Sequence, residues 1–107
     1  MRVILRQIKD ADGSRLLEAS ITAKGDLLIE GHDLGDGVER HFGVREYEWT
    51  WTIPAASLPA LLCVLGASGD VLAALRERFS GDDAAALGPF LESHGIPTDR
   101  WSRLGDW

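Results

Sequence analysis

Histidine and acidic side chains between residues 30 and 41 are the first candidates for chemistry. Imidazole nitrogens and carboxylate oxygens can bind a divalent metal ion, and such a site would group His32 with Glu30, Asp33 and His41. The spacing matches no standard metal motif, however, and adjacent residues of a strand point to opposite faces. We interpret these residues as polar surface groups, and we predict neither a metal site nor a cofactor.

Glu46 and Glu48 are a second candidate, because paired carboxylates can carry out acid–base chemistry on a sugar. They lie two residues apart in a predicted strand, so their alpha carbons are separated by roughly 7 Å on one face. An open strand face is solvated and forms no pocket. We interpret the pair as a charged surface that also discourages aggregation at sheet edges.

Nucleophilic and phosphate-binding motifs are absent from the sequence. There is no Gly-x-Ser-x-Gly elbow, and the glycine-rich stretch 66–70 lacks the Gly-Lys-Ser/Thr ending of a phosphate loop. Cys63 is the only cysteine, and its apolar surroundings in 61–65 predict that it packs as a small hydrophobic residue. We therefore predict no catalytic residues and no enzymatic activity.

The elements that position these residues begin with strands in the first half of the chain. Residues 2–9, 15–23 and 27–32 are rich in apolar residues or alternate with period two, and short turns separate them. Residues 33–44 are predicted to form a long polar loop. The clearest strand covers 45–53, where aromatic and β-branched residues alternate with glutamate and threonine.

Helices are predicted in the second half. One runs from an N-cap at Ser57 to about residue 65, and the next follows an N-cap at Asp70 and ends near residue 80. A third lies within 83–94, with a later start at 88–89 as the alternative because Pro89 favours a first turn. In the tail, 96–107, a short strand over 100–104 would add one more strand to the sheet.

This order predicts a single α+β domain spanning residues 1–107. A four-stranded antiparallel sheet, or a five-stranded one if the tail joins it, would pack on one face against two or three helices. The aromatic row of Tyr47, Trp49 and Trp51 should face the helices, while the glutamate and threonine row faces water or a partner. We expect Trp101 to fold back onto the domain, and we leave the role of Trp107 open.

Composition narrows the class of partner. Lysine and arginine number 11 against 17 acidic residues, which gives a net charge of −6. An acidic surface repels nucleic acid and anionic lipid and favours basic proteins. With one cysteine, no signal peptide pattern and no long apolar stretch, we expect a cytoplasmic protein that does not cross a membrane.

Three segments carry a resemblance to a known group of proteins. They are Leu28-Ile29-Glu30-Gly31-His32-Asp33-Leu34-Gly35, Glu46-Tyr47-Glu48-Trp49-Thr50-Trp51 and Trp101-Ser102-Arg103-Leu104-Gly105-Asp106. In the same order, they resemble small actinobacterial proteins, some of which are similar to immunity proteins of polymorphic or contact-dependent toxin systems. The resemblance implies a cytoplasmic protein that neutralises a cognate toxin, but it assigns no binding residues.

We therefore predict a protein-binding module, in particular an immunity protein that covers a basic toxin domain such as a nuclease. The alternatives are a homo-oligomeric scaffold, including a homodimer, and a small enzyme or metal-binding domain that uses the loop from His32 to His41. The predicted partner-binding residues are Asp33, Asp36, Glu39, Glu46, Glu48 and Trp107. The acidic members of this set would steer association and fix its orientation.

Overall fold

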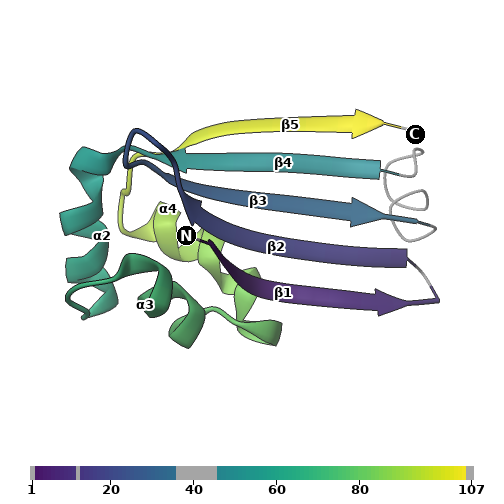
Figure 1. Ribbon diagram of the computed structural model, residues 1–107, viewed down its shortest axis with the longest axis horizontal. Helices are drawn as coiled ribbons and strands as arrows, with labels where there is room; N and C mark the ends of the chain where they lie inside the picture. The colour runs from purple at the N-terminus through teal and green to yellow at the C-terminus, as the bar shows by residue number, and fades with distance from the viewer. Residues whose placement is uncertain (1, 12, 36–45, 106–107) are drawn as a thin grey trace.

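The computed structural model describes residues 2–11, 13–35 and 46–105, and it confirms the α+β class. Five strands form one antiparallel sheet in the order β1-β2-β3-β4-β5 (Figure 1). The strands are β1 (Arg2–Asp10), β2 (Gly13–Ile21), β3 (Leu27–Leu34), β4 (Glu46–Ile53) and β5 (Asp99–Gly105). The tail thus supplies the fifth strand, and β3 extends two residues into the segment that we predicted to be a loop.

Between β4 and β5 the chain forms the helices, which gather at one end of the sheet (Figure 1). They are the short 3-10 turn η1 (Ala55–Ser57), α2 (Leu58–Leu65), α3 (Val71–Arg78), the 3-10 segment η2 (Gly81–Ala86) and α4 (Leu87–Ser93). Asp70 caps α3 as predicted, because its carboxylate accepts a hydrogen bond from the Leu72 amide. The alternative for the third helix is correct, since α4 begins only at Leu87.

Alternation along the strands builds the core. Successive residues of a strand point to opposite faces, and one row of apolar residues on each of β2, β3 and β4 turns toward the helices. Leu17, Ala19, Leu27, Ile29 and Ile53 are buried on that face. From the helices the core receives Leu61, Val71, Leu72, Leu75, Phe79, Ala84, Leu87 and Leu91.

Two tryptophans of β4 pack against two glycines. A Cβ placed on Gly31 would lie 2.1 Å from the Trp49 ring, so this ring lies directly over the backbone of β3. A Cβ on Gly88 would lie 2.7 Å from the Trp51 ring, so α4 approaches the sheet through its glycine. The two indole rings also contact each other, with centroids 4.4 Å apart. The predicted orientation toward the helices is therefore confirmed for Trp49 and Trp51, although both rings are only half-buried.

Two side chains are more exposed than the sequence predicted. The segment of Trp101 folds back onto the domain as part of β5, but the side chain is 50% exposed. Cys63 is exposed on α2 and is not part of the core. Leu61 is the buried residue of α2, so the apolar composition of 61–65 did not indicate which side chains of this helix face the core. No helix in the described ranges has the length and apolar character needed to cross a bilayer.

The glycine at position 31 offers a direct test of the packing under Trp49. Gly31→Ala should destabilise the fold by about 1–3 kcal/mol, because the added methyl group forces the indole out of its place. Urea unfolding followed by far-UV circular dichroism measures this cost. The same substitution in a Trp49→Leu background should cost clearly less. An equal cost in both backgrounds would show that the two residues do not meet.

Candidate functional site

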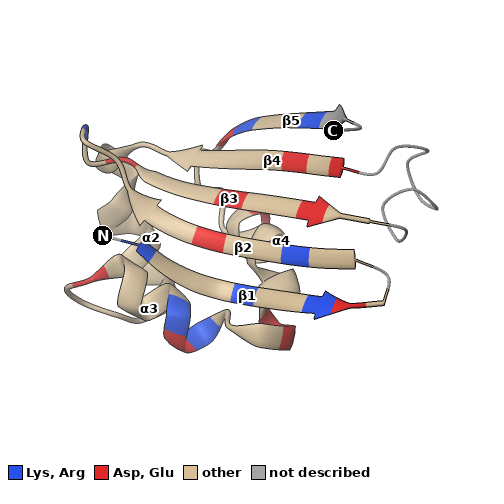
Figure 2. Cartoon of the chain, turned by 45° about the vertical axis from the view of Figure 1, so that its right-hand side comes forward, with Lys and Arg blue, Asp and Glu red and all other residues tan. Residues whose placement is uncertain are grey.

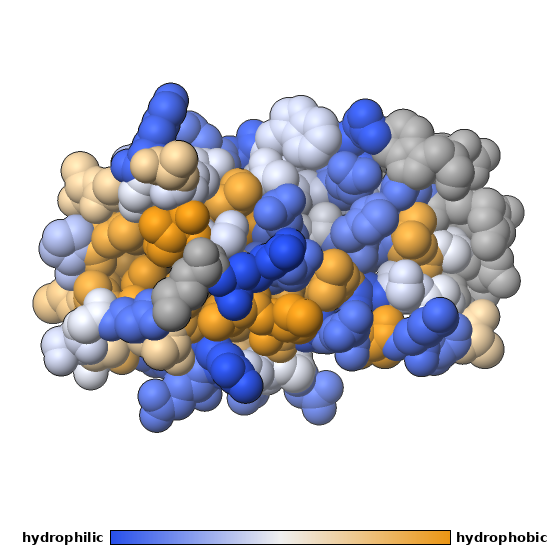
Figure 3. Space-filling model, in the orientation of Figure 1, coloured by the Kyte–Doolittle hydropathy of each residue, from blue (hydrophilic) through white to orange (hydrophobic). Residues whose placement is uncertain are grey.

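The face of the sheet opposite the helices is the candidate binding surface, and we call it the open face. Strand pairing places residues side by side across it: Leu16 with His32, Glu48 and Arg103, and Glu18 with Glu30, Thr50 and Trp101. Figure 3 shows hydrophilic side chains mixed with apolar ones over the strands, and the largest apolar area toward the helical end of the molecule. The open face thus combines polar side chains with apolar ones such as Ile4 and Leu16.

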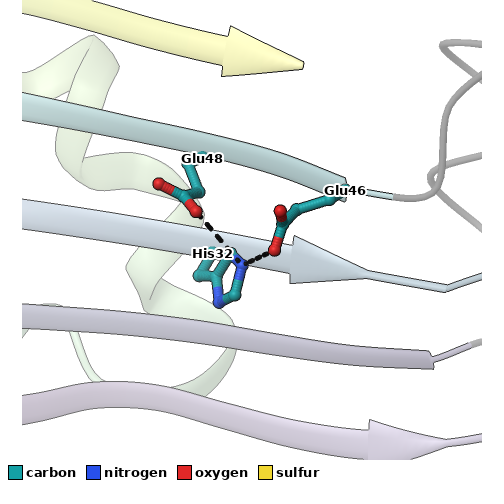
Figure 4. Close-up of side chains that lie close together, drawn as sticks. All are labelled: His32, Glu46 and Glu48. Atoms are coloured by element: carbon teal, nitrogen blue, oxygen red, sulfur yellow. Dashed lines mark hydrogen bonds and ion pairs between the residues drawn. The ribbon is translucent and has the colours of Figure 1, made fainter. Parts of the chain in front are cut away.

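Three chemically active side chains converge on this face. His32 of β3 lies between Glu46 and Glu48 of β4 (Figure 4), because Glu48 is its direct partner in the antiparallel register and Glu46 is its diagonal neighbour. The His32 Nε2–H donates a hydrogen bond to Glu46 Oε2 over 2.5 Å. The same nitrogen lies 3.7 Å from Glu48 Oε1. The candidate ligand atoms of all three residues lie within 4.8 Å of one another.

The two glutamates differ in how deeply they are buried. Glu46 is only 3% exposed, whereas Glu48 and His32 are partly exposed. Glu46 Oε1 is buried and has no hydrogen-bond partner among the described residues, although a buried carboxylate oxygen normally has one. Glu48 lies 3.8 Å from the guanidinium of Arg103. The carboxylate that we predicted to be solvated is therefore enclosed, and half of its hydrogen-bonding capacity is unused.

A shallow depression lies beside this cluster. It has a volume of about 250 Å³ and is lined by Leu16, Glu18, Glu30, Gly31, His32, Glu48, Trp49 and Thr50. Its side chains come mainly from the open face of the three central strands. Three carboxylates and one imidazole border it, so it offers a negative environment to any group that enters.

Charge on the open face follows the strand order. Acidic residues occupy the central strands β2, β3 and β4, whereas basic residues are most frequent on the outer strands β1 and β5 (Figure 2). Arg2 of β1 forms an ion pair with Glu18 over 3.0 Å. Large apolar side chains lie near the same two edges, where Ile4 is 49% exposed and Trp101 is 50% exposed. The result is an acidic centre with apolar and basic groups at its margins.

Asp33 belongs to the other face. It pairs with Arg15 and Tyr47 across the sheet, and the side chains of this row point away from His32. Burial raises the pKa of the Asp33 carboxyl, and the nearby positive charges of Arg15, Arg6 and His32 oppose this effect only in part. Asp33 is therefore a half-buried charge whose ionised form is disfavoured in the folded protein.

The predicted site residues do not form one cluster in the structure. Of the predicted partner-binding set, Glu48 is a partly exposed acid on the open face, Glu46 lies beside it but is buried, and Asp33 lies on the opposite face. Asp36, Glu39 and Trp107 lie outside the described residues, as does His41 of the alternative metal grouping. His32, Glu46 and Glu48 were each noted in the sequence, but their convergence was missed because it depends on the pairing of β3 with β4.

No protein-family model, curated protein or solved structure matches this chain. Its function is therefore inferred from the geometry and charge of its own residues.

The raised pKa of Asp33 leads to a prediction about stability and pH. Because the folded state binds this proton more tightly than the unfolded state does, the carboxyl costs stability as the pH rises through its folded-state pKa. Asp33→Asn should raise the free energy of unfolding near pH 7, and this gain should shrink toward pH 3. Urea unfolding across that range measures the difference. Asp99→Asn, at an exposed position in β5, is the control and should change little at any pH. A gain that grows in acid would contradict the assignment.

Proposed function

We propose that this protein is a binding module that docks another protein on the open face of its sheet. The observation that carries the proposal is the combination of exposed Trp101 and Ile4 with the central acids Glu18, Glu30 and Glu48. Exposed tryptophan supplies large contact area in protein interfaces. Charged neighbours of one sign select a partner of the opposite sign and accelerate its approach.

The partner is proposed to be a basic protein, in particular a toxin domain such as a nuclease that this chain neutralises as an immunity protein. The net charge of −6 and the acidic centre of the open face support a basic partner. The resemblance of three sequence segments to small actinobacterial proteins, some of which are similar to immunity proteins, supports a toxin domain as the partner. Binding alone would be sufficient for neutralisation, since covering a toxin's active site requires no reaction.

A matched pair of charge reversals tests the docking face. Glu30 is exposed in the middle of the open face, and Glu92 is exposed on α4. In pull-downs from the native host, wild type and Glu92→Lys should recover the same basic protein, encoded beside this gene. Glu30→Lys and Trp101→Ala should recover at least roughly tenfold less, as expected for a central charge and an aromatic anchor. Circular dichroism verifies that each variant is folded.

Two results would contradict this proposal. One is recovery of no basic protein encoded next to this gene. The other is an equal loss of the partner in Glu30→Lys and Glu92→Lys, which would mean that binding follows total charge and does not use the open face.

A homo-oligomer is the second candidate function, and the edges of the sheet favour it. β1 and β5 each pair with one neighbour in the described sheet, and β1 carries the exposed residues Ile4 and Ile8. Free strand edges with apolar side chains can pair between copies of a chain. Light scattering at several concentrations separates the two functions. A monomer excludes the scaffold, and a tight dimer that Ile4→Lys dissociates supports it.

A further inference from the structure

We propose that His32, Glu46 and Glu48 form a binding site for a divalent transition metal ion of the zinc class. This metal site does not depend on the proposed docking of a partner protein, because all three ligands belong to this chain. It also differs from the grouping of His32 with Glu30, Asp33 and His41 that the sequence suggests. In the structure Asp33 lies on the opposite face of the sheet, and the two glutamates of β4 take the place of the loop residues.

The donor set suits such an ion. One imidazole nitrogen and two carboxylate oxygens are ligands that zinc accepts, and two carboxylates neutralise a dipositive charge. Ligands bound at about 2.0–2.2 Å to a tetrahedral ion lie roughly 3.3 Å from one another. The His32 nitrogen is already 2.5 Å from Glu46 Oε2 and 3.7 Å from Glu48 Oε1. Small side-chain rotations would therefore bring all three to bonding distance.

The burial of Glu46 supports the metal site independently of the donor atoms and their distances. Its side chain is almost fully enclosed, and within the described ranges its Oε1 atom has no hydrogen-bond partner. An enclosed carboxylate is costly unless its charge and both oxygens are compensated. His32 compensates one oxygen only. A metal ion bound by both Glu46 oxygens would compensate the whole carboxylate, and it would replace the proton that His32 Nε2 now donates to Oε2.

The site would be open on one side. Three protein ligands leave a coordination position for water or an external ligand, as in zinc sites that exchange their fourth ligand. The neighbouring depression of about 250 Å³ is bordered by His32 and Glu48, so an added ligand can reach the ion from there. Water fits this position best, since the carboxylates of Glu18 and Glu30 border the depression and disfavour an anionic ligand.

Calorimetric titration of the full chain with zinc chloride tests the site. We expect one ion per chain, and at least a roughly tenfold loss of affinity in His32→Asn and in Glu48→Gln, because each removes one of three ligands. Glu48 is partly exposed, so its substitution should leave the fold intact, as circular dichroism can verify. Glu92→Gln removes an exposed acid on α4, outside the open face, and should keep wild-type affinity.

A cobalt titration supplies a separate signal, since visible absorption reports the ligand set of the bound ion. The cobalt spectrum should be lost in His32→Asn and retained in Cys63→Ser, which removes the exposed thiol on α2. Absence of saturable zinc binding, or zinc affinity unchanged in both His32→Asn and Glu48→Gln, would overturn the proposal. The titration uses no partner protein, so its failure would leave the docking proposal standing, and the reverse also holds.

Discussion

The contact between Trp49 and Gly31 sets the register on which both faces of the sheet depend. A side chain at position 31 would collide with the indole, so β3 offers one place where this ring fits against its backbone. A slip of one residue would turn every side chain of β4 to the other face. It would expose the tryptophans and bury the glutamates and threonines between the sheet and the helices. The cost of that exchange makes the observed pairing the stable one.

The register of β3 and β4 has different consequences on the two faces of the sheet. Toward the helices, the same strand places Trp51 against Gly88, which lets α4 approach the sheet closely. The guanidinium carbon of Arg100 in β5 lies over the Trp51 ring, 4.8 Å from the ring centroid. This contact extends the packing of the aromatic side chains to β5. Toward the open face, the register places Glu48 beside His32 and leaves Glu46 diagonal to it. A packing contact in the half-buried aromatic layer thus assembles the polar cluster on the opposite surface.

Most of the fold follows from patterns that the sequence displays. The alternation of Tyr47, Trp49 and Trp51 with polar residues predicted β4 and its inward face, and Asp70 marked the start of α3. Period-two and capping signals are local, so they can be interpreted without knowing the fold. The extension of β3 to Leu34 could not be predicted, because Asp33 and Gly35 are typical of loops and only pairing with β2 and β4 makes the segment a strand.

The site was harder to predict than the fold. His32 and the two glutamates are 14 and 16 positions apart in the sequence, and no spacing rule connects them without the register of β3 and β4. A glycine inside an apolar strand was the available signal, since it often marks a close approach of another group to the backbone. Gly31 would then have suggested Trp49 as its partner, and His32 would have followed opposite Glu48.

The open face combines features that are usually found apart. Its centre is acidic and partly hollow, its margins carry exposed apolar side chains, and one of its carboxylates is enclosed with an oxygen unpaired. Docking of a basic protein would use the charge and the margins, whereas a metal ion would use the enclosed cluster. Protein docking and metal binding both depend on the pairing of β3 with β4.

Proton NMR of the Gly31 Hα atoms tests this pairing most directly. Because the Trp49 indole lies over that backbone position, its ring current should displace at least one Gly31 Hα resonance strongly from the usual glycine range. Nuclear Overhauser contacts should also connect these protons with the indole ring. A Gly31 resonance at the ordinary glycine position, with no contact to the Trp49 ring, would contradict the register and the polar cluster that follows from it.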